Sequence, residues 1–179
     1  QGKYQSQQGQ PLCLPCTPGK FMDDTGEDTK CNECDVNFVS ESAGAENCTA
    51  CGVGSSTSKQ KGSARCSSCE AGTYGDGCRS CRKGQYRSGS DPVKVLCRNC
   101  STGYYSDEFG QGSCLPCIPG EYNDVAGAVA CKLCEKNSFS SDKNRTVPCD
   151  PCGTGRTSDS GSTKCSACAA GKIVNELTK

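Results

Sequence analysis

Large apolar side chains are scarce in this chain of 179 residues. Leu, Ile, Val and Phe together number 21, and Trp is absent. A share below about 20% in these four types is too small for an ordinary hydrophobic core. High net charge, the other mark of a disordered chain, is also lacking, because 20 acidic residues balance 20 basic ones. The sequence therefore predicts a fold that is held together by something other than a core.

Further absences exclude classes of function. The chain has no His, the commonest acid or base at neutral pH, and no nucleophile elbow, phosphate-binding loop or dinucleotide fingerprint. We therefore expect no enzymatic activity and no cofactor. No basic block favours nucleic acid, and no apolar run approaches the roughly 20 residues of a membrane span. The opening QGKYQSQQGQ shows no signal-peptide pattern and suits a mature or truncated N-terminus.

Cysteine is abundant instead. All 20 Cys fall in ten C-x-x-C units that begin 12 to 19 residues apart. Closing a loop of about 15 residues with a disulfide contributes roughly 3 kcal/mol in the chain-entropy model, so several such loops can replace a core. The predicted disulfide residues are Cys13 and Cys16, Cys31 and Cys34, Cys48 and Cys51, Cys66 and Cys69, Cys78 and Cys81, Cys97 and Cys100, Cys114 and Cys117, Cys131 and Cys134, Cys149 and Cys152, and Cys165 and Cys168.

A turn is expected after every unit. Three residues beyond each second Cys stands a residue that accepts positive φ: Gly19, Asn37, Gly54, Gly72, Gly84, Gly103, Gly120, Asn137, Gly155 and Gly171. Two positions later a large side chain usually follows: Phe21, Val39, Tyr74, Tyr86, Tyr105, Tyr122, Phe139 and Ile173. We expect this side chain to cover the neighbouring disulfide and form a local mini-core.

A longer period groups the units in threes. CLPCTPGKF at Cys13 returns as CLPCIPGEY at Cys114, and Asn37 returns as Asn137. The predicted organisation is a leading polar segment (1–12), three cysteine-rich triplets (13–65, 66–113 and 114–164) and the start of a fourth (165–179).

Zinc binding, redox chemistry and structural bridging are the usual roles of C-x-x-C pairs. Without His, and with ten pairs in Gly-rich loops, we favour structural disulfides in an oxidising, extracellular or cell-surface setting. The acidic run Asp23, Asp24, Glu27 and Asp28 lacks the ligand order of a calcium loop and is expected to be a solvated turn. No metal site is therefore predicted.

The pattern C-x-x-C-x-x-G-x-[FY], followed by a Gly-Ala step as in SESAGAENC (40–48) and NDVAGAVAC (123–131), resembles the ephrin-receptor-like cysteine-rich repeat. The TNF-receptor-like repeats are a more distant likeness. The resemblance covers about residues 13–171. It implies extracellular repeats that stack end to end into rods, as in receptor ectodomains, secreted matrix proteins and surface proteins of protists and algae. The expected fold is small and disulfide-rich: an elongated tandem array of ten C-x-x-C units with short β-hairpins and turns and little helix.

Two disulfide schemes remain open. Units pair off in the first scheme, as Cys13 with Cys31 and Cys16 with Cys34, and we favour this scheme because the resembled families favour such crossed pairs. In the second scheme the second Cys of each unit joins the first Cys of the next, as Cys16 with Cys31, which leaves Cys13 and Cys168 for partners beyond this segment.

Three sequons are candidate N-glycosylation sites. Asn144-Arg145-Thr146 is the plainest, because the middle residue of the other two, at Asn47 and Asn99, is a Cys that is expected to join a bridge.

We expect a non-enzymatic extracellular structural segment, a disulfide-stapled, glycosylated rod. It would act as a spacer or filament-forming element of a cell-surface appendage or matrix, with other protein chains, including copies of itself, as partners. The alternative is a receptor ectodomain that binds a protein ligand through the basic middle triplet, at Arg79, Arg82, Lys83 and Arg87. A solvated charged face is the third interpretation of that cluster.

Overall fold

The computed structural model describes residues 1–7, 9, 12–23, 30–92 and 94–169. Within these ranges there is no helix, and every strand is two residues long. The strands form ten separate antiparallel pairs, and nine disulfides join them. The prediction of a small disulfide-rich array of hairpins is therefore confirmed.

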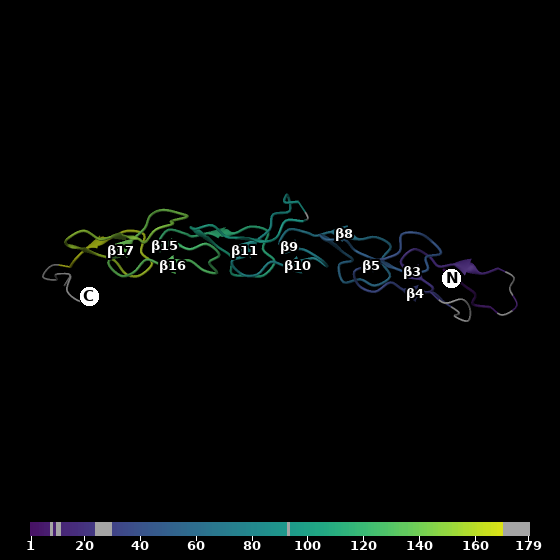
Figure 1. Cartoon of the computed structure of the whole chain (residues 1–179). Coiled ribbons are helices and arrows are strands. Elements are labelled where there is room, and N and C mark those ends of the chain that lie inside the picture. The colour runs from purple at the N-terminus through teal and green to yellow at the C-terminus, as the bar shows by residue number, and fades with distance from the viewer. Residues whose placement is uncertain (8, 10–11, 24–29, 93, 170–179) are drawn as a thin grey trace. The chain divides into compact units, whose positions relative to one another are not determined.

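The chain divides into two compact units. The first unit contains residues 1–80 and 89–96. Its strands, several of which are labelled in Figure 1, are β1 (Lys3–Tyr4), β2 (Leu14–Pro15), β3 (Lys20–Phe21), β4 (Asn32–Glu33), β5 (Phe38–Val39), β6 (Thr49–Ala50), β7 (Ser55–Ser56), β8 (Ser67–Ser68), β9 (Thr73–Tyr74) and β10 (Arg79–Ser80).

The second unit contains residues 81–88 and 97–179 and repeats the same plan. Its strands are β11 (Gln85–Tyr86), β12 (Arg98–Asn99), β13 (Tyr104–Tyr105), β14 (Leu115–Pro116), β15 (Glu121–Tyr122), β16 (Lys132–Leu133), β17 (Ser138–Phe139), β18 (Asp150–Pro151), β19 (Arg156–Thr157) and β20 (Ser166–Ala167). The compact units end at none of the predicted triplet boundaries, so the grouping in threes stays a prediction.

Each hairpin joins one C-x-x-C unit to the next. Its first strand follows the turn residue, and its second strand is the x-x pair of the next C-x-x-C. In β15 and β16, Glu121 pairs with Leu133 and Tyr122 pairs with Lys132. The turn prediction is confirmed at all nine described positions, which have positive φ. The tenth, Gly171, lies outside the described residues, as do Ile173, Asp24, Glu27 and Asp28.

The first hairpin begins earlier than the sequence predicts. Gly2 has a φ of +68°, and β1 pairs with β2. The turn and strand of a repeat are thus already present in the predicted leading polar segment.

The buried positions differ from the predicted mini-core. Apart from Val39, the described large side chains after the turns are only half-buried. The second Cys of most units is buried instead: Cys16, Cys34, Cys69, Cys81, Cys100, Cys117 and Cys134. A second buried row lies six residues beyond the second Cys: Met22, Ser40, Thr57, Arg87, Ser106, Asn123, Ser140 and Ser158. All but Met22 are polar, so this row is no ordinary hydrophobic core.

Candidate functional site

Backbone hydrogen bonds tie each turn to the following hairpin. In the second unit, the Gly120 N–H donates to the Ser140 carbonyl at 2.8 Å. The Cys134 N–H donates back to the Gly120 carbonyl, also at 2.8 Å. The same pair of bonds recurs at Gly103, with Asn123 and Cys117. Because each turn both donates and accepts, consecutive hairpins are held in a fixed register.

A second set of backbone hydrogen bonds joins a unit to a loop that lies one unit further along the chain. The loop before each C-x-x-C folds back, so that the Gly161 N–H donates to the Cys134 carbonyl at 2.8 Å. The Gly161 carbonyl then lies directly against Gly120, where an added β-carbon would overlap it. Gly103 meets the Asn144 carbonyl in the same way. Gly103 and Gly120 are therefore needed for two reasons, a positive φ and a close approach of backbone.

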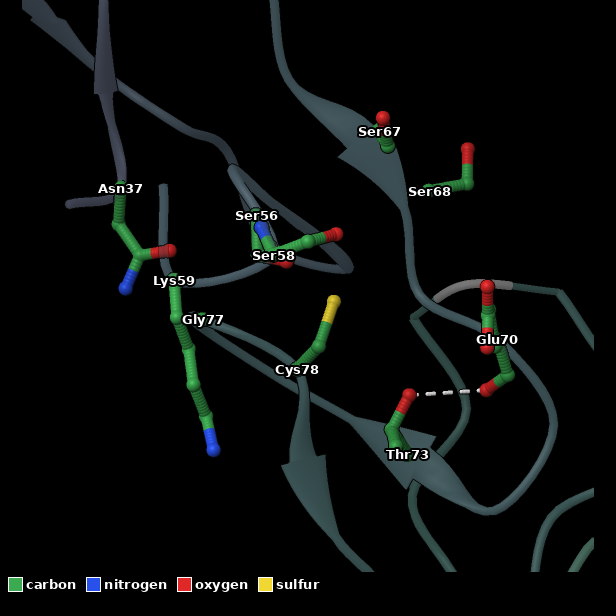
Figure 2. A pocket seen from close by; sticks show the side chains of 10 residues that line it. All are labelled: Asn37, Ser56, Ser58, Lys59, Ser67, Ser68, Glu70, Thr73, Gly77 and Cys78. Carbon is green, nitrogen blue, oxygen red and sulfur yellow. Dashed lines mark hydrogen bonds between the residues drawn. The ribbon is translucent and has the colours of Figure 1, made fainter. Parts of the chain in front are cut away.

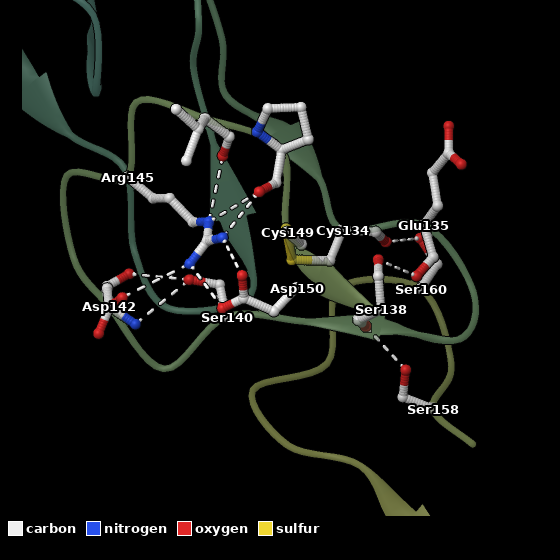
Figure 3. The surroundings of a disulfide bond; sticks show 12 residues. Cys134, Glu135, Ser138, Ser140, Asp142, Arg145, Cys149, Asp150, Ser158 and Ser160 are labelled. Carbon is white, nitrogen blue, oxygen red and sulfur yellow. Dashed lines mark hydrogen bonds and ion pairs between the residues drawn. A yellow bond between two sulfur atoms is a disulfide. The ribbon is translucent and has the colours of Figure 1, made fainter. Parts of the chain in front are cut away.

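Asn123 and Ser158 of the buried polar row form hydrogen bonds to neighbouring backbone groups. The Asn123 amide donates to the Tyr104 carbonyl at 2.7 Å and accepts from the Val125 N–H at 3.1 Å. The Ser158 hydroxyl donates to the Ser138 carbonyl at 2.7 Å (Figure 3). Sequence reasoning missed this row because its members share a spacing from the Cys and not a residue type. Aligning the units on their second Cys would have found it.

Arg145 closes a loop beside the Cys134–Cys149 disulfide (Figure 3). Its side chain is only 9% exposed, and its guanidinium forms two hydrogen bonds with the Asp150 carboxylate, at 2.7 and 3.0 Å. It also donates to the carbonyls of Val147 and Pro148. Planar, bidentate pairing of this kind fixes geometry as well as charge. The loop thus has a defined shape although it contains no regular structure.

The disulfides follow the second predicted scheme. Cys117 bonds Cys131, and Cys134 bonds Cys149, so the pairing of units in twos is wrong. The reason is geometric: residues three apart along an extended strand point to opposite faces, so the first Cys of a unit reaches back and the second reaches forward. Cys13 and Cys168, which the sequence placed among the disulfide residues, have no disulfide partner in the described part of the chain.

No metal site is found in the part of the chain that the structure describes. There, no group of three or more His, Cys, Asp or Glu side chains is arranged to hold a metal ion. Eighteen of the cysteines are oxidised in disulfides, which removes the thiolates that zinc would need.

Residues 90–134 match the family model described as tyrosine-protein kinase ephrin type A/B receptor-like. That stretch contains the units at Cys97, Cys114 and Cys131, and the hairpin, turn and disulfide pattern on either side of it is the same. Over residues 90–134 the chain carries ephrin-receptor-like cysteine-rich repeats. With the nine disulfides, this module indicates an extracellular receptor-type or repeat domain. Comparison with curated proteins gives no match.

The three sequons differ in whether their middle residue belongs to a disulfide. Asn47, Asn99 and Asn144 are all exposed. Cys48 and Cys100, the middle residues of two sequons, are bridged, and Cys100 is fully buried. The side-chain amide oxygen of Asn99 also accepts a hydrogen bond from the Gln85 amide at 3.0 Å. Asn144 alone belongs to a sequon without a bridged residue.

One member of the predicted basic cluster is not at the surface. Arg87 is 1% exposed and belongs to the buried row, so it cannot contact a partner from the surface. Arg79 is exposed in the first compact unit, whereas Arg82 and Lys83 are exposed in the second. The Lys83 ammonium lies 5.8 Å from the centre of the Phe109 ring. The correction has a simple cause, because residue type alone does not reveal that position 87 falls on the buried row.

Exposed charge pairs support individual hairpins. Lys132 in β16 bonds Asp124 at 2.7 Å and also lies 5.6 Å from the centre of the Tyr122 ring. The hydrogen bond from Lys132 lowers the pKa of Asp124, and the same bond raises the pKa of Lys132. In the first unit, the hydrogen bond and charge of Asp35, 2.9 Å away, raise the pKa of Lys61. These groups lie at the surface, so their contribution to stability is small.

The first unit contains a cavity of about 460 Å³ where the repeat is shortest (Figure 2). The Cys69–Cys78 disulfide closes a sequence separation of 9, against 13 to 16 for the others, so the fold-back loop is short here. Polar side chains dominate the lining. It includes four of the six non-glycine residues of the described chain with positive φ: Asn37, Ser58, Lys59 and Cys78.

Proposed function

We propose that the chain is a non-enzymatic extracellular spacer or filament-forming element of a cell-surface appendage or matrix. The observation that carries this proposal is the repeated attachment of each hairpin to its neighbours. A disulfide and two sets of backbone bonds join successive repeats, as at Cys134, Gly120 and Gly161. An array in which each repeat contacts its near neighbours behaves as a one-dimensional chain of coupled elements. Such a chain resists extension at every repeat.

The chemistry of the surface is consistent with this role. Acidic and basic residues balance over the whole chain. The ephrin-receptor-like cysteine-rich module is non-catalytic. Within the described ranges, no helix is long and apolar enough to cross a membrane.

Single-molecule extension of the unreduced chain between two handles tests the spacer role. We expect the contour length to stay fixed until a reductant is added. Opening the Cys117–Cys131 loop, with its separation of 14, then releases about 50 Å at roughly 3.5 Å per residue. Full extension without reductant would contradict a spacer that is stapled at every repeat.

Electron microscopy of the native, unreduced material tests filament formation. Filaments with a regular axial repeat are the expected result. Discrete particles would contradict the filament-forming role and leave the spacer role to the extension experiment.

One observation favours a second candidate function, the binding of an acidic protein. Phe109 is 64% exposed and lies next to Lys83, and Arg82 is exposed beside Lys83 in the chain. An aromatic ring with neighbouring cations suits a partner that presents carboxylates and apolar groups.

Binding of a polyglutamate peptide tests this candidate. We expect the double variant Arg82→Ala/Lys83→Ala to lose binding, and the wild-type affinity to fall as salt screens the charges. The matched control, Lys136→Ala/Lys143→Ala, removes two exposed cations of the same compact unit. Equal binding by the two double variants would exclude a specific site at Arg82 and Lys83.

A further inference from the structure

The tips of the fold-back loops share one backbone conformation. At six of these tips, a residue with positive φ donates its N–H to the backbone carbonyl of the second Cys of an earlier repeat. Glycine occupies this position five times: Gly44, Gly62, Gly110, Gly127 and Gly161. In the loop that folds onto Cys117 the residue is Asn144, with a φ of +57°. Glycine is the usual residue here, and asparagine also accepts positive φ, so Asn144 fits this backbone position.

The side chain of Asn144 is held at the surface in a defined position. Its amide nitrogen donates a hydrogen bond to the Tyr104 hydroxyl at 3.0 Å. Its backbone N–H donates to the Cys117 carbonyl at 2.9 Å, and its own carbonyl lies against Gly103. The adjacent Arg145 fixes the rest of the loop through Asp150. The acceptor nitrogen of the sequon therefore lies within hydrogen-bond distance of the Tyr104 hydroxyl.

A small cavity adjoins that ring. Tyr104 and Tyr86 line it, together with Ser101 and Cys114, and its volume is about 210 Å³. Both tyrosines are half-buried, and the Arg98 guanidinium lies 5.4 Å from the centre of the Tyr86 ring. A sugar ring has an apolar face and a polar rim. Two tyrosines, each with an apolar body and a hydroxyl group, match both parts.

We propose that Asn144 carries an N-linked glycan whose first sugar packs on Tyr104 and enters the Tyr86–Tyr104 cavity. In the transfer step, the Asn144 Nδ2 forms a bond to the anomeric carbon of a lipid-linked oligosaccharide diphosphate. The bond from that carbon to the diphosphate oxygen breaks, the lipid diphosphate leaves with the electron pair, and Nδ2 loses one proton. The second amide hydrogen remains for the Tyr104 hydroxyl. The inference goes beyond the proposed function, because an unmodified Asn144 would leave the spacer role untouched.

The same reasoning ranks the three sequons. At Asn47 and Asn99 the middle residue is bridged, and Asn99 sits in β12 with its side chain bonded to Gln85. We therefore expect Asn144 to be the most completely modified of the three sites.

Mass spectrometry of the chain secreted by a eukaryotic host measures the modification. Treatment with an amidase that releases N-glycans in heavy-oxygen water marks each modified asparagine as labelled aspartate. We expect the label at Asn144, and its loss in Thr146→Ala, which keeps the asparagine but destroys the acceptor motif. Asn144→Gly is the folding control, since glycine is the usual residue at this position. An unlabelled Asn144 in the wild-type chain would overturn the proposal.

Nuclear Overhauser contacts measure the packing. We expect contacts between the acetyl methyl protons of the first N-acetylhexosamine and the ring protons of Tyr104. They should persist in Tyr104→Phe, which retains the ring, and disappear in Tyr104→Ala, with the glycan still attached in both variants. A fully modified Asn144 without these contacts would overturn the packing of the sugar on the tyrosines.

Discussion

The carbonyl of Gly161 lies so close to the α-carbon of Gly120 that a β-carbon on Gly120 would overlap its oxygen. The two glycines belong to different repeats, and neither contact atom is in a side chain. Because backbone meets backbone here, the turn leaves no room for a side chain at Gly120. Substitution of Gly120 therefore tests directly whether the turns stack in this way.

Gly120→Ala should lower the free energy of unfolding by about 2–4 kcal/mol, because it combines backbone strain at a φ of +88° with a steric overlap. Gly155→Ala should cost only about 1 kcal/mol, since its φ is positive but its surroundings are open. Gly153→Ala, with open surroundings and no positive φ, should stay within about 0.5 kcal/mol of the parent. Thermal unfolding of the three variants gives the order of their losses in stability. Equal losses in Gly120→Ala and Gly155→Ala would contradict a contribution of the close backbone contact to stability.

Arg145→Met should destabilise the loop beside Cys149 by about 1–3 kcal/mol, because the Asp150 carboxylate and two backbone carbonyls lose their donors. Arg145→Lys should rescue only part of the loss, since an ammonium cannot form the bidentate pair. Hydrogen exchange of the loop amides is the readout. Lys143→Met, at a nearby exposed site, should leave exchange unchanged, and a similar effect from both methionine variants would contradict a specific role for Arg145.

The pair of Asp124 and Lys132 should respond to pH in a defined direction. The lowered pKa of Asp124 means that the pair's stabilisation is complete above the ordinary carboxyl pKa and is lost as the pH falls through the lowered value. The raised pKa of Lys132 means that it is lost again as the pH rises through that raised value. Carboxyl titration by NMR should show the pKa of Asp124 rising to its ordinary value in Lys132→Met and staying low in Lys136→Met. An unchanged pKa in Lys132→Met would assign the shift to another cause.

Removing one disulfide should loosen only nearby repeats. The double variant Cys134→Ser/Cys149→Ser opens a sequence separation of 15, which costs about 3 kcal/mol in the chain-entropy model. Hydrogen exchange should increase in β17 and β18, and at the Gly161 amide that bonds Cys134. Exchange in β11 and β12 should not change, because coupling falls off between neighbours. Uniform loosening of the whole compact unit would contradict the ladder of local contacts.

The turns could be predicted from sequence because only Gly and Asn occupy their positive-φ position. Gly120 and Asn137 are therefore visible in the spacing alone. The disulfide pairing is not visible in this way. The pairing depends on the extended backbone between the two Cys of a unit. In this backbone, residues three apart such as Cys131 and Cys134 point to opposite faces.

The buried row could not be predicted from residue type. Arg87, Asn123 and Ser140 occupy equivalent positions, yet they differ in charge, size and chemical type. Burial here follows from the backbone, which encloses whatever side chain stands six residues beyond the Cys. For that reason Arg87, which the sequence places in an exposed basic cluster, is buried in the structure.

The connection of each repeat to the next is the central claim, and disulfide mapping of the unreduced chain tests it most directly. Digestion at acidic pH, where thiolates are too scarce for exchange, preserves the native bridges for mass spectrometry. The account predicts peptides that join Cys117 to Cys131 and Cys134 to Cys149. Peptides that join Cys114 to Cys131 and Cys117 to Cys134 would contradict it, because the repeats would then be closed pairs instead of a continuous ladder.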